Sequence, residues 1–181
     1  MSWKNGAAGY GSLSMALHWL MLLLIVAVYA TMELKSVFPK GSAPREAMAN
    51  WHYMLGLSVF VLVWLRLAAR ATGSDPVIQP PLPARQAMLA RIMHWALYAL
   101  MVGLPLLGWL TLSAKGKPVP FFGMELPALV GKNEGLAKLL KEIHEFVATM
   151  GYFLIGLHAA AALFHHYVKR DNTLVLMLPG R

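Results

Sequence analysis

The chain has 181 residues, of which 58% are hydrophobic and only 13% are charged, and its formal net charge is +8. Its mean hydropathy of +0.55 is too high for an ordinary soluble domain, so we expect residues 1–181 to form a single integral membrane domain. The basic residues lie at the ends of apolar runs and in short loops, which argues against nucleic-acid binding. The chain has no cysteine, which excludes disulfides, thiolate-bound iron–sulfur clusters and covalently attached haem.

Four apolar runs are long enough to cross a bilayer, and the first is too long for the core of a signal peptide. An amphipathic lead-in over residues 134–146, capped by Asn133, is expected to enter the last of them. Short loops between the runs predict an all-α, four-helix up-down bundle with both termini on one side and residues 115–133 as the longest loop. The membrane spans are expected at about residues 13–32, 47–71, 88–114 and 140–168.

Histidines recur at seven-residue intervals in the fourth run. His144, Gly151, His158 and His165 therefore return to one face of a helix in a left-handed bundle. His144 and His158 are separated by about 21 Å along the helix axis, within a hydrocarbon layer of about 30 Å. One helix face thus presents an imidazole near each membrane surface, as two stacked haems require. Gly151, between the two rings, is expected to let a porphyrin edge approach the backbone.

The direction of each span decides which other histidines lie at the same depth. The first span starts on the terminal side, whereas the second and fourth start on the far side. His52 is therefore level with His144, and His18 is level with His158, while His94 is a rival for the second pair. A lone membrane histidine more often hydrogen-bonds to another helix, but four at two matched depths favour bis-histidine haem binding in the bundle core.

Other side chains are candidates for contact with a haem propionate or a quinone. Arg66 lies fourteen residues after His52, at the depth of the terminal-side pair, where a propionate would balance its charge. An arginine that snorkels to the membrane surface is the alternative. His165, one heptad beyond the last paired histidine, suits a hydrogen bond to a quinone carbonyl, and simple interfacial placement is its alternative. His94 and Arg91 are further candidates.

A family resemblance is carried by three stretches: Leu17-His18-Trp19, Asn50-Trp51-His52, and the segment from Gly151 through His158 and His165-His166 to Asp171-Asn172-Thr173-Leu174. These resemble the prokaryotic di-haem cytochrome b561 family, and within it the superoxide oxidase (superoxide:ubiquinone oxidoreductase) branch. The resemblance covers essentially the whole chain, is strongest from His144 to Pro179 and is weak in the longest loop.

The resemblance implies two non-covalent b haems. One would be bound by His18 and His158 on the cytoplasmic side and the other by His52 and His144 on the periplasmic side, so that His94 would not be a ligand. It also implies the bacterial inner (cytoplasmic) membrane with cytoplasmic termini. Charge alone does not orient the bundle, because eight basic residues fall on each side.

The activity implied by the resemblance is oxidation of periplasmic superoxide. An electron would pass through the outer and inner haems to ubiquinone, and dioxygen would be released, without acid–base catalysis by a side chain. A basic far-side mouth would attract the superoxide anion. The candidates for this steering are Lys35, Lys40, Arg45, Lys115, Lys117, Lys138 and Lys141.

Two other functions are compatible with a histidine-rich bundle. One is a haem-bearing membrane anchor that relays electrons for a dehydrogenase or hydrogenase partner subunit. The other is a metal transporter lined by histidine and methionine. The transporter is disfavoured because neither carboxylates nor clustered methionines occur in the spans at the spacing of metal ligands.

Overall fold

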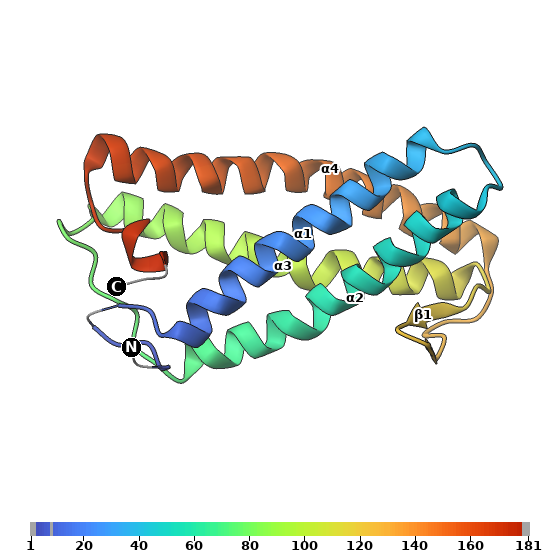
Figure 1. Cartoon of the computed structure of the whole chain (residues 1–181), viewed down its shortest axis with the longest axis horizontal. Coiled ribbons are helices and arrows are strands. Elements are labelled where there is room, and N and C mark those ends of the chain that lie inside the picture. Colours follow the sequence, from blue (N-terminus) through green and yellow to red (C-terminus); the bar gives the residue numbers. More distant parts are fainter. Residues whose placement is uncertain (1–2, 8, 179–181) are drawn as a thin grey trace.

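Four long helices dominate the computed structural model, which describes residues 3–7 and 9–178 (Figure 1). The helices are α1 (Ser12–Val37), α2 (Ala43–Ala71), α3 (Ala84–Ala114) and α4 (Glu134–Phe164). Each is long and apolar enough to cross a membrane. The predicted all-α, four-helix up-down bundle is therefore confirmed, and both ends of the chain lie at the same end of the bundle (Figure 1). Pro179, the last residue of the stretch that resembles the family most strongly, lies outside the described residues.

Short polar motifs set the helix ends. Asn133 caps α4, because its side chain accepts a hydrogen bond from the backbone N–H of Leu136 at 2.9 Å. Pro44 occupies the first turn of α2, where an N–H group would have no intrahelical partner. The predicted lead-in and the fourth span consequently form one continuous helix, which begins at Glu134, before the start expected for the span.

The loop after α3 contains a β-hairpin that the sequence patterns did not predict. Strand β1 (Val119–Phe121) pairs antiparallel with β2 (Met124–Leu126). Phe122 and Gly123 form the turn with φ angles of 44° and 84°, the left-handed conformations that a two-residue type I′ turn requires. Val119 is buried against α2 and α3, so the hairpin covers the far end of the bundle.

The helices approach one another unequally around the bundle. The backbones of α1 and α2, of α2 and α3, and of α3 and α4 run close together. Within the described part of the chain, α4 has at most isolated approaches of this kind to α1 and α2. A compact apolar cluster fills the space between α1, α2 and α3, and consists of Met21, Val59, Val63, Tyr98 and Met101. The wider separation of α4 from α1 and α2 leaves room for large side chains or a cofactor between them.

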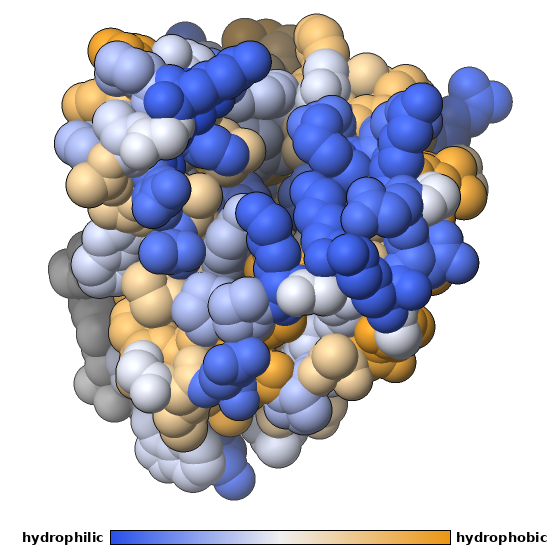
Figure 2. Space-filling model, turned by 90° about the vertical axis from the view of Figure 1, so that its right-hand side faces the viewer, coloured by the Kyte–Doolittle hydropathy of each residue, from blue (hydrophilic) through white to orange (hydrophobic). Residues whose placement is uncertain are grey.

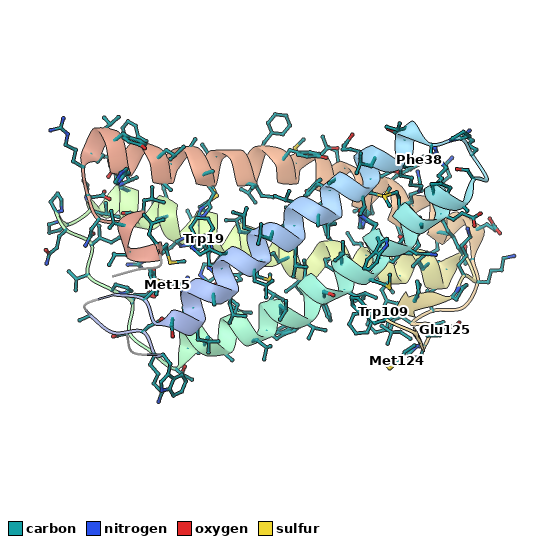
Figure 3. All side chains as sticks on the ribbon, viewed as in Figure 1. Met15, Trp19, Phe38, Trp109, Met124 and Glu125 are labelled. Atoms are coloured by element: carbon teal, nitrogen blue, oxygen red, sulfur yellow. The ribbon has the colours of Figure 1, made fainter. Side chains whose placement is uncertain are left out.

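A folded-back tail covers part of the terminal-side end. After α4 the chain makes a π-helical turn (His165–Lys169) and returns to a short 3-10 turn (Val175–Met177). The indole N–H of Trp19 donates to the carbonyl of Met177 at 2.8 Å, and Trp19 points from α1 toward this tail (Figure 3). The side chain of Asn172 holds the tail to the α2–α3 linker through hydrogen bonds with the linker backbone at Gln79 and Val77.

Candidate functional site

The four histidines expected to bind haem iron lie in two pairs along α4. The ring centroids of His52 and His144 are 6.2 Å apart, and the two ring planes are inclined by 70°. The centroids of His18 and His158 are 6.4 Å apart, with an inclination of 72°. Helix α1 supplies one histidine, α2 supplies one and α4 supplies two. Two sites of nearly identical geometry therefore stand at different depths in the bundle.

This spacing fits an iron ion between the two rings of each pair. Metal–imidazole bonds of about 2 Å on each side, added to the distance from each nitrogen to its ring centre, place the centroids about 6 Å apart. Two axial imidazoles need to share only the iron–nitrogen axis, so ring planes inclined by 70° and 72° are compatible with such ligation. The histidines are therefore suited to hold b-type haem without a covalent bond.

A cavity of about 350 Å³ opens beside the far-side pair. Nδ1 of His52 lies 3.1 Å from the carbonyl oxygen of Val28. Because a carbonyl only accepts, Nδ1 carries the proton and Nε2 keeps the lone pair that a metal needs. A smaller void of about 40 Å³ shares Tyr29 and Pro105 with the cavity and extends the space between α1, α2 and α3.

His144 completes the wall of this cavity. Its ring faces Gly108 of α3, where a Cβ would lie 3.5 Å from the ring atom Cε1. Its Nδ1 is buried beside the backbone of Leu104 but has no hydrogen bond of normal geometry to any described residue. A buried imidazole without such a hydrogen bond is suited to bind a group that is not part of the protein, and the iron of a haem would be such a group.

Basic side chains from three elements line the far-side mouth of the cavity. Lys35 at the end of α1, Lys115 after α3 and Lys141 on α4 all lie on its wall. Burial lowers the pKa of Lys115, and the nearby Lys141 and Lys117 lower it further. Figure 2 views this end of the molecule and shows hydrophilic residues gathered over much of it. The mouth thus combines an apolar interior with a cationic rim.

The remaining residues of the predicted steering set are less suited to that role. Arg45 lies close enough to act on the charge of Lys35, but its guanidinium donates to the carbonyls of Lys35 and Phe38 and so caps the end of α1. Lys138 is largely exposed and pairs with Glu142 at 4.0 Å. Lys40 and Lys117 are exposed and are not part of the cavity wall.

Two carboxylates moderate the charge of the mouth. Glu33 and Glu145 also line the cavity, and Glu145 pairs with Lys141 at 2.7 Å. Among the described residues, Lys35 and Lys115 have no carboxylate within salt-bridge distance. These two ammonium groups are consequently the strongest candidates for attracting a small anion or for pairing with a propionate.

The terminal-side pair includes a third histidine and an arginine. The ring of His94 lies 5.6 Å from that of His158, so His94 is a further neighbour of this pair. One guanidinium nitrogen of Arg66 lies 3.1 Å from Nδ1 of His18, and another lies 3.4 Å from the carbonyl of Ser14. Arg66 therefore faces the paired histidines, whereas the structure shows no described partner for the exposed Arg91.

Comparison with known proteins assigns this arrangement to a family. A family model described as prokaryotic cytochrome b561 matches residues 9–180. The chain belongs to the prokaryotic cytochrome b561 family. The family resemblance read from the sequence motifs is thereby confirmed, and the protein is a multi-pass bacterial membrane electron-transfer protein with b-type haem.

Three curated relatives match this cytochrome b561 over nearly its whole length. Cytochrome b561 homolog 1 of Escherichia coli K12 is 46% identical, over 91% of this chain and 94% of the relative. The probable superoxide oxidase CybB of Yersinia pestis is 37% identical, over 95% and 97%. Cytochrome b561 homolog 2 of Escherichia coli K12 is 27% identical, over 98% and 95%. A superoxide oxidase name thus occurs among the relatives.

Gly151 of this cytochrome lies against a side chain of α1. A Cβ at position 151 would overlap the hydroxyl of Tyr29 and lie 3.0 Å from Cδ1 of Leu100. The Tyr29 hydroxyl donates to the carbonyl of Ala148 at 2.8 Å. In this structure Tyr29 therefore takes the space beside Gly151, and the approach of a porphyrin edge to the backbone there stays a prediction.

One polar partner was missed by sequence reasoning. Nδ1 of His165 lies 2.5 Å from a carboxylate oxygen of Asp171, six residues further along the chain. Asp171 lies in the last of the three stretches that carry the family resemblance. Helical periodicity cannot place its side chain, because the helix ends before it and Arg170 takes a left-handed conformation with φ 57°. His165 consequently lies at the terminal-side end of α4 and is partly buried beside the buried Asp171.

Proposed function

We propose that this cytochrome b561 holds two b haems and oxidises superoxide with ubiquinone as the electron acceptor. His52 and His144 would bind the far-side iron, and His18 and His158 the terminal-side iron. The observation that carries the proposal is the presence of two imidazole pairs, with spacings of 6.2 and 6.4 Å, along one helix. The relative named as a probable superoxide oxidase supports the choice of substrate.

Bound haems supply one-electron redox chemistry between the two substrates. In the overall reaction two superoxide anions leave as dioxygen, and ubiquinone takes up the two electrons and two protons to become ubiquinol. Lys35 and Lys115 attract the anion to the apolar mouth. Arg66 balances the charge of a propionate, and His165 donates a hydrogen bond to the quinone. His94 and Arg91 stay secondary candidates for such contacts.

The same proposal sets the orientation in the inner membrane. With both termini in the cytoplasm, the cationic mouth beside the far-side pair faces the periplasm, where extracytoplasmic superoxide would be encountered. The tail and His165 then lie near the cytoplasmic surface. The support for this orientation is the family resemblance, because the number of basic residues is equal on the two sides.

An electron-relaying anchor for a partner subunit is the second candidate. The observation in its favour is that the relative of 46% identity is named only as a cytochrome b561 homolog. Such an anchor would share the haem sites but would reduce quinone only when its partner is bound. Membership of a cytochrome family favours both of these functions over metal transport.

Stopped-flow spectroscopy tests the proposed activity. The oxidised, haem-loaded protein is mixed with superoxide in the presence or absence of ubiquinone, and the absorbance of reduced b haem is followed. We expect rapid haem reduction without ubiquinone, and ubiquinol formation with little accumulated reduced haem when ubiquinone is present. Superoxide dismutase should abolish both signals. Haem reduction that superoxide does not accelerate would contradict the proposal and would leave the anchor as the better candidate.

A further inference from the structure

A carboxylate is buried where α4 reaches the terminal-side end of the bundle. The side chain of Asp171 is 2% exposed, and one of its oxygens lies 2.5 Å from Nδ1 of His165. The other oxygen accepts a hydrogen bond from the backbone N–H of Thr173 at 2.9 Å. The backbone N–H of Asp171 donates in turn to the carbonyl of His165 at 3.2 Å. The ring and the carboxylate are therefore fixed against each other by the local fold.

This geometry decides which nitrogen of His165 is available to a ligand. Burial raises the pKa of the Asp171 carboxyl, but the hydrogen bonds from His165 and Thr173 outweigh burial and hold the pKa below its ordinary value. The carboxylate is thus ionised at neutral pH and only accepts hydrogen bonds. Nδ1 of His165 must be the donor in this pair, so Nε2 is the nitrogen left for another partner.

The tail that carries Asp171 is held by two other parts of the bundle. The backbone N–H of Gln79 donates to the side chain of Asn172 at 2.8 Å, and the backbone N–H of Asn172 donates to the carbonyl of Gln79 at 3.1 Å. The indole N–H of Trp19 on α1 donates a hydrogen bond to the carbonyl of Met177. The position of the carboxylate is therefore defined by tertiary contacts and does not depend on the end of α4 alone.

We infer that Asp171 is a positioning residue that makes His165 the proton donor to the quinone. This inference rests on the proposed reduction of ubiquinone, which consumes two protons at the site of reduction. His165 lies one heptad beyond His158, at the end of α4, and is 17% exposed. The neighbouring Phe164 and Val168 are exposed apolar residues, so a lipid-soluble ring can approach this end of the helix from the bilayer.

The proton transfer balances with the proposed reaction. The N–H bond at Nε2 of the protonated His165 breaks, and an O–H bond forms at a carbonyl oxygen of the quinone, while the electrons come from superoxide. Water at the terminal-side surface returns the proton to Nε2, and a second transfer completes the quinol. The Asp171 carboxylate stabilises the positive ring and keeps the proton on Nδ1, so only the Nε2 proton is exchanged.

The surroundings of the pair add little other charge. Among the described residues, His165 is the side chain whose electrostatic interaction with Asp171 is resolved. The side chains that hold the tail from α1 and from the linker, Trp19 and Gln79, are uncharged. On its own segment the neighbouring charged residues are Lys169 and Arg170, and Lys169 lies 5.9 Å from the ring of Phe164. The hydrogen bond between Asp171 and His165 is therefore the main polar interaction of the carboxylate with another side chain among the described residues.

The test isolates the quinone half of the reaction. The haem-loaded full-length protein is reduced with dithionite, mixed with a short-tailed ubiquinone, and followed as its haem reoxidises at several pH values around neutrality. In Asp171→Asn we expect reoxidation at neutral pH to slow by about tenfold or more. Its pH profile should differ from that of the wild type, because asparagine does not supply the negative charge of the carboxylate. Haem content and haem reduction by superoxide should be unchanged.

Asn172→Ala is the matched control, because it weakens the anchoring of the tail but keeps the pair, and it should reoxidise at the wild-type rate. A wild-type rate and pH profile in both Asp171→Asn and His165→Gln would overturn the inference alone. Equal slowing in Asn172→Ala would also overturn it, by showing that docking of the tail is what matters. A wild-type protein that ubiquinone does not reoxidise would overturn the proposed function and the inference together. If Asp171→Asn loses haem, Asp171→Glu and His165→Gln decide the question in the same measurements.

Discussion

At the scale of single residues, hydrogen bonds to Nδ1 prepare the histidines differently at the two sites. The carbonyl of Val28 fixes the proton of His52 on Nδ1 and leaves Nε2 free. At the other site Arg66 can only donate, so Nδ1 of His18 accepts that hydrogen bond, and iron binding through Nε2 of His18 requires Arg66 to turn to another acceptor, such as a propionate. A positive charge beside one of the two sites should favour the reduced form of the haem bound there, because reduction lowers the positive charge on the iron.

Single histidine substitutions should each remove one haem. His144→Ala is expected to abolish the far-side site and His158→Ala the terminal-side site, so that haem content falls from two per chain to one. His94→Ala should keep both haems, because His18 and His158 are the proposed ligands of the terminal-side iron. The pyridine haemochromogen assay and reduced-minus-oxidised spectra measure this content. Loss of a haem in His94→Ala but not in His18→Ala would show that the terminal-side pairing is wrong.

Removing the charge of Arg66 should change the midpoint potential of one haem and leave that of the other unchanged. In Arg66→Gln the midpoint potential of one haem is expected to fall while the other stays unchanged, since the guanidinium lies beside His18 of the terminal-side pair and makes no recorded contact with His52 or His144. A spectroscopic redox titration measures both potentials. Arg45→Gln is the control, because that arginine is bound to backbone carbonyls at the end of α1. Unchanged potentials in Arg66→Gln would indicate that the arginine is only a snorkelling residue.

At the scale of elements, α4 contacts α1 through a small group of aromatic residues. Tyr29 of α1 reaches Gly151 and the carbonyl of Ala148, and its ring lies 4.3 Å from that of Tyr152. The hydroxyl of Tyr152 donates to Glu33 at 2.8 Å. The backbones of α4 and α1 rarely come close, and these side chains bridge the two helices on the far-side half of the bundle.

A larger side chain at position 151 should weaken this contact. Gly151→Leu is expected to displace Tyr29, break its hydrogen bond to Ala148 and lower the free energy of unfolding by about 1–3 kcal/mol. Gly156→Ala is the matched control on the same helix, because a Cβ there meets no other atom within 4 Å. Thermal unfolding in detergent, followed by circular dichroism, compares the two. Equal stability of Gly151→Leu and the wild type would contradict the proposed role of Tyr29.

The sequence predicts the elements that follow a regular period and not those that depend on tertiary contacts. A heptad step and the alternating direction of the spans are enough to place His52 with His144 and to bring His18 to the depth of His158. Depth alone cannot give the rotation of α3, so His94 stayed a rival. The hairpin was missed because its turn uses Phe122 at positive φ instead of the usual Asn-Gly or Asp-Gly pair.

At the scale of the whole molecule, charge is concentrated where the apolar cavity opens. Lys35 and Lys115 come from helix ends far apart in the sequence, so only the closed bundle brings them to one mouth. Glu33 and Glu145 lie on the same wall and reduce the field, which leaves these two lysines as the main unpaired cations of the cavity among the described residues. The fold thereby converts a dispersed basic composition into a local site for anions.

This local field should govern the rate of the superoxide step and not the rate of the quinone step. In the double variant Lys35→Gln/Lys115→Gln, haem reduction by superoxide at low ionic strength is expected to slow by about tenfold. The difference from the wild type should shrink as salt is added, because the screening length falls to about 10 Å at 0.1 M ionic strength.

Lys138→Gln is the control, since Lys138 is exposed and paired with Glu142 outside the cavity. Stopped-flow measurements over a range of salt concentrations provide the rates, and reoxidation by uncharged ubiquinone should be equal in all three proteins. Equal slowing by Lys138→Gln would mean that the net charge of the surface, and not the mouth of the cavity, attracts the anion.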